Sequence, residues 1–278
     1  MTKFFVLFTL LIFSSFSLAS TKSTFCSERK SAPAFRELLR RPANLLPLKN
    51  TGGMLGLKTG VCWWHSRLQR RFSYLAYFRP DLPRPSLKQV KKIIRLIKRK
   101  ENIVVIPGFK NLDEFGRAYG KEIQKSLNAW MLGDSALRQT WIKGLKKKKI
   151  KTHQEFQTYL ESLYREFKSN NGLLFQILNF KGVSAHSWLI TDIQKDNRGE
   201  FIFEIVDSNR PQSPIRFIPD FMKLNPDISK TIQYTSYNED VNANPYKHPL
   251  FKYDDFLSLS FFQKEELRLK MALSHYCK

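Results

Sequence analysis

The sequence is poor in cysteine and in acidic residues, and both shortages restrict what the protein can be. Only three cysteines occur in 278 residues. Cys62 and His65 stand three residues apart, but no second Cys/His pair with zinc-like spacing accompanies them, so we expect neither a metal nor another cofactor. Acidic residues number 24 against 47 lysines and arginines, which gives a formal net charge of +23. Such an excess favours contact with anionic surfaces.

Long apolar segments are also scarce. The run from Phe4 to Phe16 is shorter than the ~20 apolar residues that span a bilayer. It follows Lys3 and precedes the small residues Ser17-Leu18-Ala19, a pattern typical of a secretory signal peptide cleaved near Ala19. The sequence therefore predicts a signal peptide over residues 1–19 and export of residues 20–278 to the periplasm or beyond the cell.

No internal repeat or low-complexity domain interrupts the rest of the chain, and its hydrophobic fraction of 42% indicates a real core. Helical spacing of apolar residues dominates from about 27 to 171, and strand patterns dominate from about 172 to 240. A closing helix is expected at about 260–275. This order predicts a single α+β domain, with a helical lobe packed against an antiparallel β lobe.

Several elements can be placed individually. A helix over 63–78 should follow Cys62, with the arginines at 67, 70 and 71 mainly off its apolar face. Asn111 and Thr152 each stand three residues before a glutamate, which is the signature of a helix N-cap; the first of these helices should reach about Met131. The carboxylate pair at 265–266 lies near the start of the last helix, where capping is a sufficient explanation.

The other two cysteines lie near the ends of the predicted mature chain. Cys26 and Cys277 could form a disulfide, because the termini of a compact domain are often close together. The alternative is that both are unpaired terminal residues. If they are bridged, Cys62 is the single free thiol.

Cys62 has the sequence context of a nucleophile. It follows a glycine-rich stretch that ends at Gly60, and it opens the predicted 63–78 helix. There the helix dipole and the first backbone N–H groups stabilise a thiolate and lower its pKa from about 8.5. The alternative is a buried structural cysteine, because free cysteine packs as a small hydrophobe.

His186 and the next strand supply a candidate base and orienting group. A hairpin centred on residues 196–197 would place Asp207 opposite His186, whereas a centre at 197–198 would place Asn209 there. Directly opposed residues lie with Cβ atoms roughly 5 Å apart. Either side chain could then accept from one imidazole nitrogen and leave the other for the thiol.

These motifs resemble the papain-like cysteine peptidase superfamily. The resemblance covers about residues 52–209 and rests on the Gly-x-Cys-Trp turn at Cys62, on a small residue before His186, and on Asp207 or Asn209 in the next strand. It implies a papain-like fold in which these residues are nucleophile, base and orienter. The family's oxyanion glutamine, about six residues before the cysteine, is replaced here by Gly56, and Asn50 is the nearest upstream amide.

The segment around His186 is also similar to the transglutaminase-like branch of the same broad fold, in which an aspartate orients the histidine. Trp63, His65 and Trp188 are candidate substrate-binding residues because they flank the nucleophile and the base. The five tryptophans could stack on nucleic acid, but buried aromatics are commoner and no nucleic-acid motif is present, so we do not expect that partner.

The sequence therefore predicts an exported, cysteine-dependent hydrolase, a peptidase or amidase, that acts on a peptide or amide through an acyl-enzyme. One alternative is a transglutaminase-like acyl transferase. The other is a non-catalytic, cationic envelope-binding protein of the same fold, motivated by the net charge and the missing glutamine. An anionic envelope polymer or a membrane surface is a candidate partner for either kind of protein.

Overall fold

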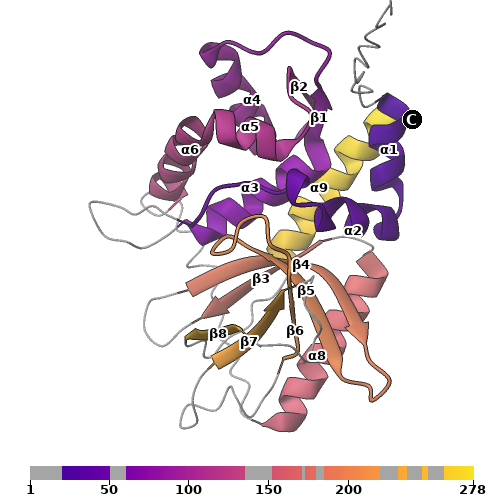
Figure 1. Ribbon diagram of the computed structural model, residues 1–278. Coiled ribbons are helices and arrows are strands. Elements are labelled where there is room, and N and C mark those ends of the chain that lie inside the picture. Colours follow the sequence, from indigo (N-terminus) through magenta and orange to yellow (C-terminus); the bar gives the residue numbers. More distant parts are fainter. Residues whose placement is uncertain are drawn as a thin grey trace, which may run out of the picture.

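The structure is a computed structural model that describes residues 21–50, 61–134, 152–170, 173–179, 185–219, 231–236, 246–249 and 260–278. The predicted signal peptide lies outside these residues. The described chain is α+β, with a helical half above a β half in Figure 1. Within the described residues, no helix is both long enough and apolar enough to cross a bilayer.

The helical half is built mainly from the first 134 residues. Its helices are α1 (Lys22–Lys30), α2 (Ala32–Arg40), the 3₁₀ turn η1 (Pro42–Asn44), α3 (Cys62–Leu75), α4 (Leu87–Arg99), α5 (Leu112–Ala118) and α6 (Gly120–Gly133). The C-terminal helix α9 (Ser260–Cys277) returns to this half and lies beside α1 (Figure 1). Two short strands, β1 (Ala76–Arg79) and β2 (Val104–Pro107), pair in parallel.

The β half contains an antiparallel sheet in the order β3-β4-β5-β6-β7-β8. Its strands are β3 (Leu174–Asn179), β4 (Ala185–Lys195), β5 (Phe201–Asp207), β6 (Ile215–Phe217), β7 (Thr231–Ser236) and β8 (Tyr246–Pro249). Helix α8 (His153–Asn170) covers one face of this sheet, where Trp188 and Ile190 join its core. Leu189, between them in sequence, packs into the core of the helical half, as strand alternation requires.

The predicted caps at Asn111 and Thr152 are confirmed. The Asn111 side chain accepts from Glu114 N–H at 2.9 Å, and the Thr152 side chain accepts from Glu155 N–H at 3.1 Å. The helix that begins after Asn111 does not run unbroken to Met131, however. Tyr119 adopts φ −126° and ψ 29°, outside the helical region, and separates α5 from α6.

The helix after Cys62 is also shorter than predicted, because α3 ends at Leu75 and the chain continues as β1. Ala76 pairs with Val104 and Phe78 with Ile106 in the parallel register. The partner strand lies about 28 residues further along the chain, so this pairing is a tertiary effect that local helical spacing could not reveal.

Helix α3 is buried along its whole length, including its arginines. Arg67, Arg70 and Arg71 are 5%, 1% and 2% exposed, so the expectation that they stand away from the core is wrong. All three contact Glu265 of α9, at 3.0 Å from Arg67, 3.3 Å from Arg70 and 2.5 Å from Arg71. Glu266 pairs with Arg70 at 3.6 Å and accepts from the Tyr74 hydroxyl.

Capping is therefore not the role of Glu265 and Glu266. Helix α9 begins at Ser260, so both carboxylates lie beyond its first turn. The surrounding guanidinium groups outweigh the effect of burial and hold the pKa of Glu265 well below its usual range. The C-terminal helix thus supplies two of the carboxylates that offset the buried positive charge of α3, and Asp134 after α6, 3.6 Å from Arg67, supplies a third.

We expect Glu265→Gln to destabilise the fold by about 3–5 kcal/mol, because it leaves buried guanidinium groups without their main counter-charge. Guanidinium chloride unfolding measures the effect. Glu200→Gln is the matched control, since Glu200 is half exposed and pairs with exposed Arg198; its change should stay within about 0.5 kcal/mol. Equal unfolding midpoints for the two variants would contradict the role of Glu265.

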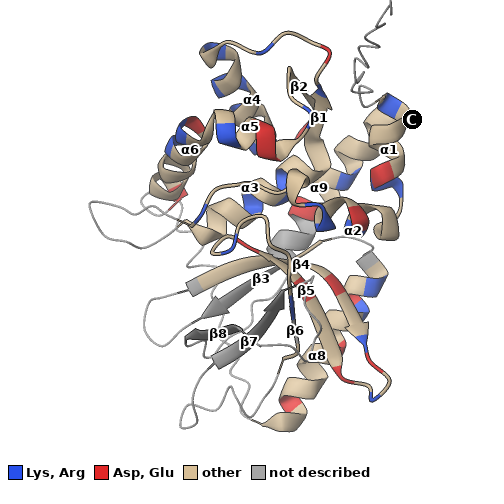
Figure 2. Ribbon diagram, in the orientation of Figure 1, with Lys and Arg blue, Asp and Glu red and all other residues tan. Residues whose placement is uncertain are grey.

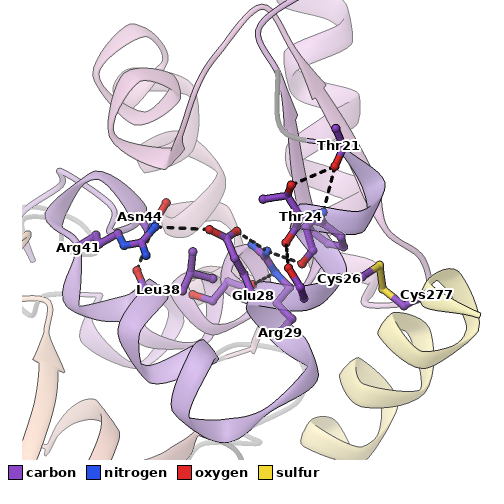
Figure 3. A network of polar contacts seen from close by, with 12 residues as sticks. Thr21, Thr24, Cys26, Glu28, Arg29, Leu38, Arg41, Asn44 and Cys277 are labelled. Carbon is purple, nitrogen blue, oxygen red and sulfur yellow. Dashed lines mark hydrogen bonds and ion pairs between the residues drawn. A yellow bond between two sulfur atoms is a disulfide. The ribbon is translucent and has the colours of Figure 1, made fainter. Parts of the chain in front are cut away.

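The structure joins Cys26 of α1 to Cys277 of α9 in a disulfide, with a Cα–Cα distance of 5.7 Å (Figure 3). The same part of α1 is held by polar contacts (Figure 3). Thr21 caps the helix at Thr24 N–H, and Arg29 donates to the Ser73 carbonyl of α3 at 2.8 Å. The disulfide holds α1 against α9, and the Arg29 contact ties α1 to α3.

Removal of the disulfide in a Cys26→Ser/Cys277→Ser variant should lower the free energy of unfolding by about 2–5 kcal/mol. The bridge closes a loop with a sequence separation of 251, and long loops gain most from cross-linking in the chain-entropy picture. Denaturant titration with Cys62 intact measures the loss. An unchanged unfolding midpoint would show that the bridge does not constrain the unfolded chain.

Ion pairs also join the two halves, between α2 and the β4–β5 hairpin of the large sheet. Arg40 forms a 3.0 Å pair with Glu204 of β5 and a 3.5 Å pair with Asp192 of β4, while Arg36 reaches Asp192 at 3.6 Å. Both carboxylates are nearly buried. These contacts, together with the packing of α3 on β4, fix the position of the hairpin relative to α3.

Candidate active site

Cys62 is the first residue of α3 and the one free cysteine among the described residues. Its residue surface is 8% exposed. The thiol is hydrogen-bonded to the His186 ring and receives the backbone N–H of Ser187. The sulfur of the helical half therefore meets two consecutive residues of β4.

His186 lies near the start of β4 and is 4% exposed. Its Nε2 is 2.7 Å from Oδ1 of Asp207, which ends β5 and is 1% exposed. With Nε2 occupied by the carboxylate, Nδ1 is the ring nitrogen that remains for the thiol of Cys62. The structure thus brings nucleophile, imidazole and carboxylate into one hydrogen-bonded chain.

The pairing of β4 with β5 differs from the first alternative expected from the sequence. Trp188, not His186, pairs with Asp207, and a β-bulge between Ile190 and Asp192 shifts the register of the hairpin. Continuing that register places Asn209 opposite His186, as in the second alternative. Asp207 is instead a diagonal neighbour on the same face, which is still within reach of a side chain.

Asn209 and Asn50 complete the polar network around the carboxylate. The Asn209 N–H donates to Asp207 Oδ1 at 2.9 Å, and its side-chain Nδ2 stands 3.5 Å from His186 Nε2. Asn50 donates through Nδ2 to Asn209 Oδ1 at 3.0 Å and accepts the Val61 N–H at 2.5 Å. One carboxamide therefore links the start of α3 to the loop after β5.

Cys62 and His186 shift each other's pKa in opposite directions. Burial acts to raise the pKa of Cys62, but the charge and hydrogen bond of His186 and the Ser187 N–H outweigh it, so the pKa is lowered. Burial acts to lower the pKa of His186, but the Asp207 carboxylate and the Cys62 thiolate raise it to about 10. Between these two pKa values the pair is a thiolate and an imidazolium.

The three candidate substrate-binding residues are all buried. Trp188 is 0% exposed and packs edge-on to His186, with ring centroids 6.1 Å apart, so it supports the imidazole and has no surface for a substrate. His65 is 3% exposed and hydrogen-bonds the Leu48 carbonyl at 2.9 Å. Burial lowers the pKa of His65 to about 4, which keeps its ring neutral. Trp63 is 6% exposed and belongs to the helical core.

Two contributors to the site escaped the sequence argument. Ser187 acts through its backbone N–H, and backbone donors leave no trace in residue type. Its position is fixed because its carbonyl accepts from Ser66 Oγ of α3 at 3.0 Å. From the sequence, Asn50 is only the nearest upstream amide; the signal that singles it out is its place just before the glycine-rich stretch that ends at Gly60.

No family model, curated protein or solved structure matches the chain. The site therefore has to be interpreted from its own geometry. Among the residues that the structure describes, no group of three or more His, Cys, Asp or Glu side chains is placed to hold a metal ion.

The pH dependence of Cys62 alkylation tests the ion pair. We expect the iodoacetamide rate of the wild-type protein to rise well below pH 8, because His186 lowers the pKa of the thiol. In His186→Ala the rise should move above about pH 8.5, the ordinary thiol value, since burial then acts without an opposing charge. The rates are measured by quenching the alkylation reaction at set times and determining the labelled fraction by mass spectrometry.

Asp207→Asn should also move the titration of the His186 ring, observed by NMR, down from about 10, because the carboxylate that raises this pKa is lost. His153→Ala is the matched control, as His153 is an exposed residue of α8. Superimposable alkylation profiles for the wild-type and His186→Ala proteins would rule out a thiolate–imidazolium pair.

Proposed function

We propose that the protein is a cysteine-dependent acyl-transfer enzyme of papain-like fold that hydrolyses an amide or a related carbonyl compound. The observation that carries the proposal is the hydrogen-bonded series Cys62, His186 and Asp207, drawn from α3, β4 and β5. A nucleophile, a base and an orienting carboxylate in contact are the parts that thiol catalysis requires. Residues 1–19 support the further proposal that the enzyme is exported.

The reaction would begin when the Cys62 thiolate attacks the substrate carbonyl carbon and forms a sulfur–carbon bond. As the tetrahedral intermediate collapses, the carbon–nitrogen bond breaks, and the His186 imidazolium gives its proton to the leaving amine. Water then attacks the thioester while neutral His186 takes a proton from it. Release of the acid returns the thiolate and the imidazolium.

Stabilisation of the oxyanion differs from the family pattern. The contacts of Asn50 are structural, because its carboxamide is bonded to Asn209 and to the Val61 N–H. An oxyanion formed beside Cys62 would instead lie at the positive end of the α3 dipole. We therefore assign Asn50 to positioning, as the residue that holds the start of α3 against the loop that carries Asn209.

Transglutaminase-like acyl transfer is a second candidate, and one observation favours it. The group that contacts His186 at 2.7 Å is a carboxylate, Asp207, whereas the amide of Asn209 stands at 3.5 Å. An aspartate orienter is the feature that links the sequence to that branch. The two reactions share the acyl-enzyme and differ only in whether water or an amine receives the acyl group.

A burst experiment with p-nitrophenyl acetate tests the proposal. The wild-type protein should release p-nitrophenol in a burst stoichiometric with enzyme and carry an acetyl group on Cys62, detected by peptide mass spectrometry. Cys62→Ala should give no burst. His186→Ala should acylate about 10² to 10⁴ times more slowly near neutral pH, which is the usual contribution of a general base.

His153→Ala serves as the control and should retain the full burst. Added glycine methyl ester separates the two candidates, because only an acyl transferase should pass the acetyl group to the amine at the expense of hydrolysis. If Cys62→Ala and wild-type enzyme release p-nitrophenol alike, the protein is not a thiol enzyme.

A further inference from the structure

A groove lies on the helical half, between α1, the start of α2 and the last turns of α9. Its volume is about 1050 Å³, and the disulfide Cys26–Cys277 forms part of its wall. The aromatic rings of Phe35 and Tyr74 also line it. The groove shares no residue with the site around Cys62, so a role for it does not depend on the proposed catalysis.

The groove is lined by basic residues without acidic ones. Its charged side chains are Lys22, Arg29, Lys30, Lys270 and Lys278. The whole chain has about one acidic residue for every two basic ones, so about two or three acids would accompany five bases if charges were mixed evenly. No aspartate or glutamate belongs to the lining. Figure 2 shows basic residues on α1 and at the neighbouring end of α9.

Two of these five cations have an acidic neighbour behind the groove wall. Arg29 is 3.6 Å from Glu28, and Lys270 is 3.9 Å from Glu266. Burial lowers the pKa of Arg29 to about 10 although Glu28 acts to raise it, so the single carboxylate does not fully compensate the buried guanidinium.

The three remaining cations are exposed on the rim of the groove. Lys22 lies over the Tyr276 ring at 4.9 Å, and within the described residues neither it nor Lys30 nor Lys278 forms an ion pair. Within the described residues, their charge is therefore left to solvent, to salt or to an anionic ligand.

The hydroxyl groups of the lining point to the kind of anion. Four serines also line the groove: Ser23, Ser27, Ser31 and Ser274. Lysine, arginine and serine side chains together are typical phosphate contacts. The volume of the groove is about 1050 Å³, and sites for whole small molecules occupy roughly 300–1,000 Å³. The groove therefore has room for a ligand larger than a single phosphate ion.

We propose that this groove binds a ligand that carries two or more phosphate groups. The rim lysines contact the phosphates, the hydroxyls of Ser23, Ser31 and Ser274 donate to their oxygens, and Arg29 provides a buried positive charge. The phosphates can belong to a soluble polyphosphate or to a lipid head group, and both sources present the same chemistry to the groove.

Calorimetric titration with tripolyphosphate tests the proposal. The triple variant Lys22→Gln/Lys30→Gln/Lys278→Gln should bind about tenfold or more weakly than wild-type protein, because it loses three charge-assisted contacts. The matched control is Lys88→Gln/Lys91→Gln/Lys92→Gln on the exposed face of α4, which removes the same charge elsewhere. Its affinity should change less than about threefold.

Orthophosphate and vesicles complete the design. Orthophosphate should bind much more weakly than tripolyphosphate, since it engages only part of the groove. Vesicles of phosphatidylcholine with cardiolipin, which carries two phosphates, should displace tripolyphosphate if the source is a lipid and leave it bound if the source is soluble.

Equal losses in the two triple variants would overturn the proposal, because binding would then follow net charge alone. Equal affinity for orthophosphate and tripolyphosphate would also overturn it. Thermal unfolding of each variant checks that the exposed substitutions leave the fold intact, and Cys62→Ala should bind like wild-type protein whatever the outcome of the acylation experiment.

Discussion

The burial of α3 is the constraint on which the rest of the structure depends. A helix with three arginines can cross the interior only if their charge is offset there. Glu265 of α9, about 200 residues further along the chain, contacts all three, and Glu266 and Asp134 each contact one of them. Isolated buried charges are costly, so α3 and α9 form one unit energetically. The disulfide at Cys277 strengthens the same unit from the other end of α9. Cys62 is the first residue of α3. The position of its thiol therefore depends on α9, although α9 lies about 200 residues away in the sequence.

The candidate site lies where this unit meets the large sheet. Ser66 of α3 donates to the Ser187 carbonyl, and the Ser187 N–H points back to the Cys62 sulfur, so helix and strand hold each other at adjacent atoms. Asn50 forms a second link from Val61 to Asn209. The thiol and the imidazole are therefore positioned by contacts on both sides of the junction. A small shift of β4 against α3 would separate His186, which lowers the pKa of Cys62, from Cys62, which raises the pKa of His186.

The sequence predicted local features better than tertiary ones. Caps at Asn111 and Thr152, and the strands that became β3 to β7, depend on neighbouring residues and could be placed from local pattern. The burial of the α3 arginines could not be placed in this way, because charged residues are ordinarily exposed. It depends on carboxylates distant in sequence, above all Glu265. Strand β1 required its parallel partner β2, and β8 lay in a stretch without a strand pattern. At the site, residue types indicated Cys62 and His186. The choice between Asp207 and Asn209 could not be made from the sequence, because the bulge near Thr191 shifts the strand register.

The electrostatics of the pair bear on how one histidine could serve both halves of the proposed reaction. A His186 pKa near 10 suits an acid that protonates a leaving amine. At neutral pH, however, a ring with this pKa is protonated and cannot act as the base that accepts a proton from water. Acylation removes this difficulty. Once Cys62 is a thioester, its negative charge and its hydrogen bond no longer raise the pKa of His186, while Asp207 continues to do so. The ring has by then passed its proton to the amine, and it stays neutral long enough to accept one from water. In the proposed reaction, the thiolate thus keeps His186 protonated before attack, and its loss on acylation favours the neutral ring that accepts a proton from water.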